Sequence, residues 1–195
     1  MNDDAVKVVS LKEIADTRLG YPFRGAIQDS AGGNVAVVTM KNADPDAGVD
    51  WAALPRTKLT GRKEPDWLRP GDVLFAARGS RNFAVHLDQV PDKAICAPQF
   101  YLLRVNAKTV QPSYLAWYLN QLPAQRYFAQ SAEGTLVQSI RRAVLVGMPF
   151  PIPSVKRQTL IAKLSDAVRR EKQLTEKLLH NREQQLMLVA SELIE

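Results

Sequence analysis

The fold is decided by the last stretch of the chain, SVKRQTLIAKLSDAVRREKQLTEKLLHNREQQLMLVASELIE at residues 154–195. All prolines, glycines and aromatic side chains of the chain lie before this stretch. Proline and glycine are costly inside helices, so we predict that residues 154–195 form one long helix. Its apolar residues recur at spacings of three and four, as at Ile161, Leu164 and Val168, which places them along one face of that helix.

The predicted helix is too long for the domain that precedes it. A helix of about 38 residues within this stretch runs about 57 Å at 1.5 Å per residue, whereas a compact domain of the first 153 residues has a diameter of about 30–35 Å. Part of the helix therefore projects, and a projecting apolar stripe needs a partner helix. Thr175 and Arg182 interrupt the stripe, so we do not expect a regular two-stranded zipper. The residues predicted to make the pairing are Leu160, Ile161, Leu164, Val168, Leu178, Leu186, Val189 and Leu193.

The first 153 residues show the mixed patterns of an α+β domain. Ser10 is a good N-cap for a short helix at 11–15. Aromatic and leucine spacing predicts helical structure at 113–132, with a break at Pro123. The alternating prolines of 149–153 predict an extended linker. β-branched and apolar runs predict strands at 34–40, 73–77, 83–87 and 100–105.

Composition excludes several classes of protein. The chain has 195 residues, 46% of them hydrophobic and 24% charged, which is ordinary for a globular protein. No apolar run is long enough to span a bilayer, and the acidic start does not resemble a signal peptide, so we expect a cytoplasmic protein that does not enter a membrane. One cysteine and two histidines exclude a disulfide framework and argue against a Cys- or His-based metal site.

Motifs of enzymes are also absent from the sequence. The glycines at 71, 79, 134 and 147 are isolated, and no phosphate-binding or zinc-protease motif occurs. Asp66 and Asp72 lie beside proline or glycine, where turn chemistry explains them. We therefore expect no catalytic residue and no metal or cofactor in this chain. Cys96 is predicted to be a small buried apolar residue, and His86 to lie on the outer face of its strand.

Three basic loops are the candidate DNA-binding sites. Arginine pairs with guanine edges or phosphate, asparagine and glutamine pair with adenine, and hydroxyl groups hold phosphate. The net charge of +6 is compatible with a nucleic-acid partner without demonstrating one. The alternative for each loop is an ordinary solvated polar loop. The candidate DNA-binding residues are Arg24, Arg78, Ser80, Arg81, Asn82, Thr135, Gln138, Arg141 and Arg142.

An ordered set of segments then points to a family. The segments are LKEIA at 11–15, GYPFRG at 20–25, GDVL at 71–74, QFYLLR at 99–104, PSYLAWYLN at 112–120, Gly134-Thr135 with Ile140, and PFPIP at 149–153 with Gln158 and Ile161. Their order and spacing, together with the terminal helix, resemble one half of the specificity (S) subunit of type I restriction–modification systems. The resemblance covers essentially the whole chain.

The resemblance implies a DNA target-recognition domain at 1–153 and a spacer helix at 154–195 that packs antiparallel against a second helix in a coiled coil or bundle. Family S subunits carry two such units, one for each half of a bipartite DNA site, and they are not catalytic. Their partners are double-stranded DNA, adenine methyltransferase (M) subunits that use S-adenosylmethionine, and in some complexes a restriction/translocase (R) subunit. Because this sequence shows one unit, we expect a homodimer. The alternative function is an adaptor that has the S-subunit fold and acts mainly through protein–protein contacts.

Overall fold

A four-stranded antiparallel sheet lies at the centre of the globular part in the computed structural model of the chain. The structure describes residues 6–27, 29–30, 32–59, 64–91, 93–106, 108–131 and 138–194. The elements, in chain order, are β1 Lys7–Ser10, η1 Leu11–Glu13, β2 Ala15–Leu19, β3 Val35–Val38, β4 Ala43–Asp44, β5 Gly48–Val49, β6 Arg56–Thr57, β7 Val73–Ala76, β8 Arg78–Gly79, β9 Phe83–His86, β10 Ala94–Cys96, β11 Phe100–Val105, α1 Pro112–Leu119, α2 Leu122–Ser131, β12 Gln138–Ser139, α3 Arg142–Gly147, β13 Pro149–Ile152 and α4 Val155–Ile194.

The central sheet has the strand order β2–β11–β7–β9. Successive side chains of a strand point to opposite faces, so Val73 and Phe75 lie on one face of β7 while Leu74 and Ala76 lie on the other. All four side chains are fully buried. Both faces of the sheet are therefore covered, which is why this strand reads as a continuous apolar run and not as an alternating one.

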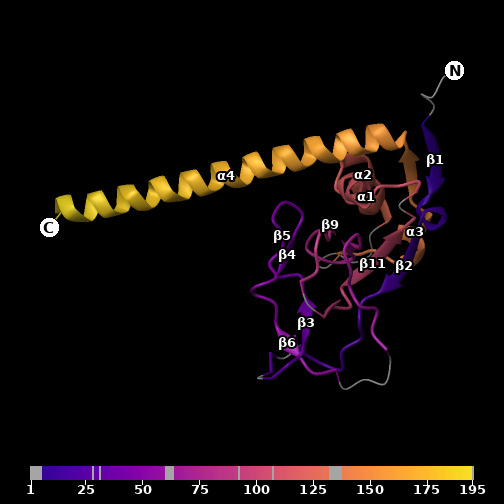
Figure 1. Cartoon of the computed structure of the whole chain (residues 1–195), viewed down its shortest axis with the longest axis horizontal. Coiled ribbons are helices and arrows are strands. Elements are labelled where there is room, and N and C mark those ends of the chain that lie inside the picture. Colours follow the sequence, from indigo (N-terminus) through magenta and orange to yellow (C-terminus); the bar gives the residue numbers. More distant parts are fainter. Residues whose placement is uncertain are drawn as a thin grey trace.

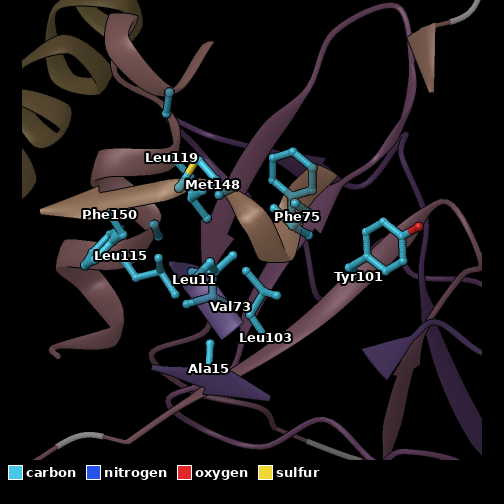
Figure 2. Packing of buried hydrophobic residues seen from close by; sticks show 14 of the residues in the cluster. Leu11, Ala15, Val73, Phe75, Tyr101, Leu103, Leu115, Leu119, Met148 and Phe150 are labelled. Atoms are coloured by element: carbon cyan, nitrogen blue, oxygen red, sulfur yellow. The ribbon is translucent and has the colours of Figure 1, made fainter. Parts of the chain in front are cut away.

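Helices cover the first face of the central sheet. Figure 2 shows Val73, Phe75 and Leu103 of the sheet facing Leu115 and Leu119 of α1, with side chains from η1 and β13 closing the cluster. The ring of Phe75 also packs against Phe128 of α2, with ring centroids 4.8 Å apart. The aromatic side chains at 114–128 thus belong to the core, as their spacing predicts.

A second sheet covers the other face. It has the order β10–β3–β6, with β10 and β3 parallel and β3 and β6 antiparallel. Val38 and Cys96 from this sheet pack in one cluster with Leu74, Phe100 and Leu102 from the central sheet. The prediction that Cys96 is a buried apolar residue is confirmed, because the side chain is 2% exposed and burial raises the pKa of its thiol to about 12.

Most predicted elements are confirmed, and the strands β3, β7, β9 and β11 lie within the predicted ranges. The helical region divides into α1 and α2 between Leu119 and Leu122, because Pro123 fits the first turn of a new helix better than the interior of an old one. The short helix after Ser10 is a single 3₁₀ turn, and Ala15 already belongs to β2. Ser10 and Glu13 form a capping box there, and the hydrogen bonds that Ser10 donates lower the pKa of Glu13.

The prediction of a linker at 149–153 is wrong in one respect. The segment is extended, but as β13 it pairs antiparallel with β1, with Val9 opposite Phe150. Proline removes only its own N–H group, so alternating prolines leave the residues between them able to pair, and such a strand fits at an edge. Phe150 is fully buried in the core.

The helix α4 runs from the globular part far beyond it, as predicted from its length (Figure 1). It begins at Val155, next to the predicted boundary after residue 153; the division into two domains stays a prediction. Among the described residues, no helix combines the length and the apolar character needed to cross a membrane.

Gln158 anchors the first turns of α4. Its side chain is fully buried, donates hydrogen bonds to the carbonyl oxygens of Thr109 and Pro153 at 3.0 and 2.9 Å, and accepts one from the backbone N–H of Gln111 at 2.9 Å. Ala162, one turn later, is also buried. One amide side chain therefore ties the start of α4 to the loop before α1.

Replacing Gln158 by alanine is expected to lower the free energy of unfolding by about 2–3 kcal/mol, because three buried backbone groups lose their partner. Urea denaturation followed by circular dichroism measures this loss. The control is Gln185→Ala, at an exposed position of the same helix, which is expected to change little. Equal stabilities of the two variants would contradict the anchoring role of Gln158.

Candidate nucleic-acid interface

Two of the three basic loops lie side by side. The short strands β8 and β12 pair antiparallel, with Arg78 opposite Ser139 and Gly79 opposite Gln138. The backbone N–H of Ile140 also donates to the carbonyl oxygen of Ala77 at 2.9 Å. Residues separated by about sixty positions in the sequence thus lie side by side, and the side chains of Arg78 and Arg141 are both exposed.

The loop after β8 is shaped by residues that also belong to the candidate set. Asn82 is buried and donates its side-chain N–H to the carbonyl oxygen of Ala76 at 2.9 Å, so it holds the loop closed. Arg81 pairs with Asp44 at 2.6 Å, and its guanidinium lies over the ring of Phe83. Ser80 is exposed between them.

The loop after β12 carries two exposed arginines, Arg141 and Arg142. Arg142 turns back and donates to the carbonyl oxygen of Thr17 at 3.1 and 3.3 Å, which ties the start of α3 to β2. Arg141 lies just before α3 and is exposed. The backbone of Gln138 is described, whereas Thr135 lies outside the described residues.

The third loop belongs to a different part of the fold. Tyr21 and Phe23 form an edge-to-face pair and pack with Val35 and Val37 of the smaller sheet. Arg24 follows them and is exposed. The β8–β12 pairing does not include this loop, so only two of the three predicted loops are brought together by strand pairing.

Several other cations of the molecule already have acidic partners. Arg18 lies between Asp66 and Asp16, at 2.5 and 2.7 Å, and its hydrogen bonds to the carboxylates of Asp66 and Asp16 raise its pKa. Arg104 binds the buried Asp72 at 2.9 Å. These pairs explain why a net charge of +6 gives little information about where DNA would bind.

His86 differs from the expectation of an outward-facing strand residue. It is half-buried, lines a groove beneath α4, and its Nδ1 lies 3.0 Å from Asp88. Burial lowers the pKa of its imidazole, against the opposing effects of Asp88 and of Asp166 on α4. The ring is therefore mainly neutral near pH 7 and does not add to the positive surface.

The apolar residues predicted to pair α4 with another helix are mostly exposed. Ile161 differs from the rest of this set, because it packs against the core of the globular part. The others are more than half exposed, namely Leu160, Leu164, Val168, Leu178, Leu186, Val189 and Leu193. Nothing within the described chain covers this stripe beyond the first turns of the helix.

One contact of α4 was not predicted from the sequence. The β4–β5 hairpin reaches α4, where Asp46 forms an ion pair with Lys172 and its carbonyl oxygen accepts a hydrogen bond from Gln173 at 2.7 Å. The partners are 126 residues apart in the sequence. The local pattern of either segment carries no signal for such a contact.

The described residues show no group of three or more His, Cys, Asp or Glu side chains placed to hold a metal ion. The expectation that this chain uses no metal or cofactor stays a prediction.

The fold is similar to that of solved S subunits of type I restriction–modification systems. A crystal structure of the S subunit from M. genitalium matches with a TM-score of 0.61 and 16% identity, over 94% of this chain and 44% of that chain. A chain from a structure of the assembly and conformational transition of a type I R-M system matches with a TM-score of 0.65 and 17% identity, over 94% of this chain and 43% of that chain. The HsdS subunit from Thermoanaerobacter tengcongensis matches with a TM-score of 0.60 and 16% identity, over 89% of this chain and 39% of that chain.

The chain thus spans about four tenths of the length of these solved subunits. Their low identity to this chain means that the likeness is one of fold. No protein-family model and no curated protein sequence matches the chain. The resemblance to one half of an S subunit, inferred from the ordered segments, is confirmed at the level of the fold.

Proposed function

We propose that this chain, which has the fold of one half of a type I S subunit, is a DNA-specificity subunit that reads one half-site per copy. The observation that carries the proposal is the pairing of β8 with β12, which brings the loops of Arg78 and Arg141 side by side. A surface that reads DNA needs arginine and amide side chains together with groups that hold phosphate. Within two adjacent loops, Arg78 and Arg141 supply the arginine side chains, and the hydroxyl groups of Ser80 and Ser139 can hold phosphate.

The test begins by selecting duplexes from a random DNA library with the purified protein. On the enriched duplex, Arg78→Ala and Arg141→Ala are each expected to weaken binding about tenfold, since a good arginine contact to a base contributes about 1–3 kcal/mol. Binding is also expected to fall steeply with salt, because phosphate contacts release counterions. Fluorescence anisotropy at several salt concentrations measures both effects.

Lys177→Ala is the matched control, because it removes an exposed cation that belongs to α4 and not to the loops at β8 and β12. Affinity that stays at the wild-type level in the double variant Arg78→Ala with Arg141→Ala would place the DNA surface elsewhere. Failure of the wild-type protein to enrich any sequence would favour the alternative function, an adaptor that acts mainly through protein contacts.

We further propose that α4 pairs antiparallel with α4 of a second copy. Charge supports this arrangement, because residues 156–175 carry six basic and two acidic side chains whereas residues 176–195 carry two basic and four acidic ones. An antiparallel pair brings the basic half of each helix to the acidic half of the other, while a parallel pair opposes like charges. The two-fold symmetry of the dimer would then be matched by a palindromic bipartite site.

The remaining partners of the proposal are adenine methyltransferase (M) subunits, which supply S-adenosylmethionine chemistry that this chain does not supply itself, and in some complexes a restriction/translocase (R) subunit. The support is the fold and the exposed apolar stripe, which offers a surface for further helices. A DNA pull-down with and without a methyltransferase subunit separates this function from the adaptor alternative. The isolated chain is expected to give no product with magnesium and S-adenosylmethionine.

A further inference from the structure

The helix α4 is attached to the globular part at two separate places. The first is its base, where Gln158 is buried and hydrogen-bonded. The second is the tip of the β4–β5 hairpin, where Asp46 contacts Lys172 and Gln173. The base extends through Ile161, which packs against the core, to the buried Ala162, and Ala162 and Lys172 are 10 residues apart, which is about 15 Å along a helix. Two separated attachments define the direction of a rod, whereas one leaves it free to pivot.

The hairpin that makes the second attachment is itself stiffened. The carboxylate of Asp44 accepts hydrogen bonds from the backbone N–H groups of Asp46 and Ala47 at 2.8 and 3.0 Å, which closes the turn. Gly48 has a φ of +81°, a conformation that other residues rarely adopt. Burial raises the pKa of Asp44, but the hydrogen bonds from Ala47, Asp46 and Arg81 outweigh it and leave that pKa lowered.

The hairpin is in turn fixed to the central sheet through Arg81. This side chain pairs with Asp44 and lies over the ring of Phe83, which is buried on β9. A chain of contacts therefore runs from the sheet through the hairpin to α4. In Figure 1 the hairpin rises from the lower part of the molecule toward the underside of α4.

Packing between the two attachments leaves a gap. A groove of about 790 Å³ separates α4 from the globular part there, and its walls include His86, Trp117, Asn120 and Arg169. Since this space is open and partly polar, no continuous apolar core holds the middle of the helix. The contacts at the far end of the groove then have a large influence on the angle of the helix.

We propose that the β4–β5 hairpin is a brace that sets the angle between the recognition domain and α4, with Asp46, Lys172 and Gln173 as positioning residues. An exposed ion pair adds little to folding stability, so the brace narrows the range of helix angles without holding the fold together. A tilt of about 10° at the base moves the far end of a 40-residue helix by about 10 Å, given its length of about 60 Å.

The consequence for DNA rests on the function proposed above. If α4 joins two recognition domains, its angle sets the distance between the half-sites they read. A displacement of about 10 Å corresponds to about three base pairs of B-DNA, which rise about 3.4 Å each. The brace therefore determines how strictly one spacer length is preferred, while the loops at β8 and β12 determine which bases are read.

The brace is tested by the distance between two spin labels, which is measured by pulsed electron paramagnetic resonance on the full chain. Lys58→Cys near the smaller sheet and Gln185→Cys on the outer part of α4 supply exposed label sites, while the native Cys96 is buried and its thiol is not labelled. Dilution with unlabelled protein removes the distances between labels on two different copies of the chain. The wild-type protein is expected to give one narrow distance distribution.

The brace variant is Lys172→Ala with Gln173→Ala, since alanine preserves the helix. It is expected to broaden the distance distribution at least twofold, and the control Lys177→Ala with Gln184→Ala, one to three turns further along, is expected to leave it narrow. Asp46→Lys should also broaden it, and Asp46→Lys with Lys172→Asp should restore it. A narrow distribution in the brace variant, or no rescue by the charge exchange, would overturn the proposal.

Selection from DNA with random spacers tests the consequence separately. Wild-type protein is expected to enrich one spacer length, and the brace variant the same half-site sequences with two or more neighbouring lengths. An unchanged spacer preference in the brace variant would overturn the role in spacing. Failure of wild-type protein to enrich any DNA would refute the proposed function and with it the role in spacing, while the spin-label result would still decide whether the brace exists.

Discussion

Replacing Asp72 by alanine is expected to lower the free energy of unfolding by about 3–5 kcal/mol, because it leaves a largely buried guanidinium without its counter-charge. The carboxylate of Asp72 is 3% exposed and accepts hydrogen bonds from Nε and Nη2 of Arg104 at 2.9 and 3.2 Å. It also accepts the backbone N–H of Arg69 at 3.0 Å. Arg104 in turn donates to the carbonyl oxygen of Trp67 at 2.5 Å.

Chemical denaturation of four proteins measures this effect as a double-mutant cycle: wild type, Asp72→Ala, Arg104→Ala and the double variant. The double variant should lose less free energy of unfolding than the two single variants lose together, since it leaves no unpaired buried charge. The matched control is Asp88→Ala, because Asp88 is also paired but its side chain is 70% exposed. A loss below about 1 kcal/mol for Asp72→Ala would contradict this account of the pair.

The second large effect concerns the proposed pairing of α4. Leu164→Glu with Val168→Glu is expected to convert a dimer into a monomer of 21.7 kDa, with at least a hundredfold weaker association. Both side chains are more than half exposed in the single chain, so the substitution costs the isolated fold little, whereas pairing would bury four carboxylates without partners. Light scattering after size exclusion measures the mass, and circular dichroism checks that the helix remains.

His180→Glu with Gln184→Glu is the control for this experiment. It adds the same charges at the same spacing, at exposed positions on the side of the helix away from Leu164 and Val168. It is expected to remain dimeric. A wild-type protein that stays monomeric at high micromolar concentration would refute the pairing of two copies, and a dimer that survives the Leu164 and Val168 substitutions would place its interface elsewhere.

Local patterns predicted most of the elements of the fold. The strands β7 and β9 and the helix α4 follow from apolar runs, turn residues and a period of three to four, all of which act over a few neighbouring residues. The aromatic residues of α1 and α2 were predicted to be core for the same reason. Family-like segments, taken in order, also predicted the overall arrangement, and the likeness to solved S subunits confirms it as a fold.

The candidate site was predicted less completely. Arginine and amide content identified the loops at 78–82 and 138–142, but not that β8 and β12 join them. Nor did content show that Arg142 donates to the Thr17 carbonyl oxygen or that Asn82 is buried and closes its loop. Composition gives the type of a side chain, while its partner depends on which distant segment comes near.

By itself, the sequence determined that a long helix with an apolar stripe follows a mixed α+β domain, because helix period, breakers and length are properties of neighbouring residues. Only the tertiary structure decided that 149–153 is a strand paired with β1, that Asp72 and Arg104 neutralise each other, and that the β4–β5 hairpin reaches α4. Each of these contacts joins segments that are far apart along the chain. Whether such a contact forms depends on the path of the backbone between the two segments, and a local sequence pattern does not predict that path.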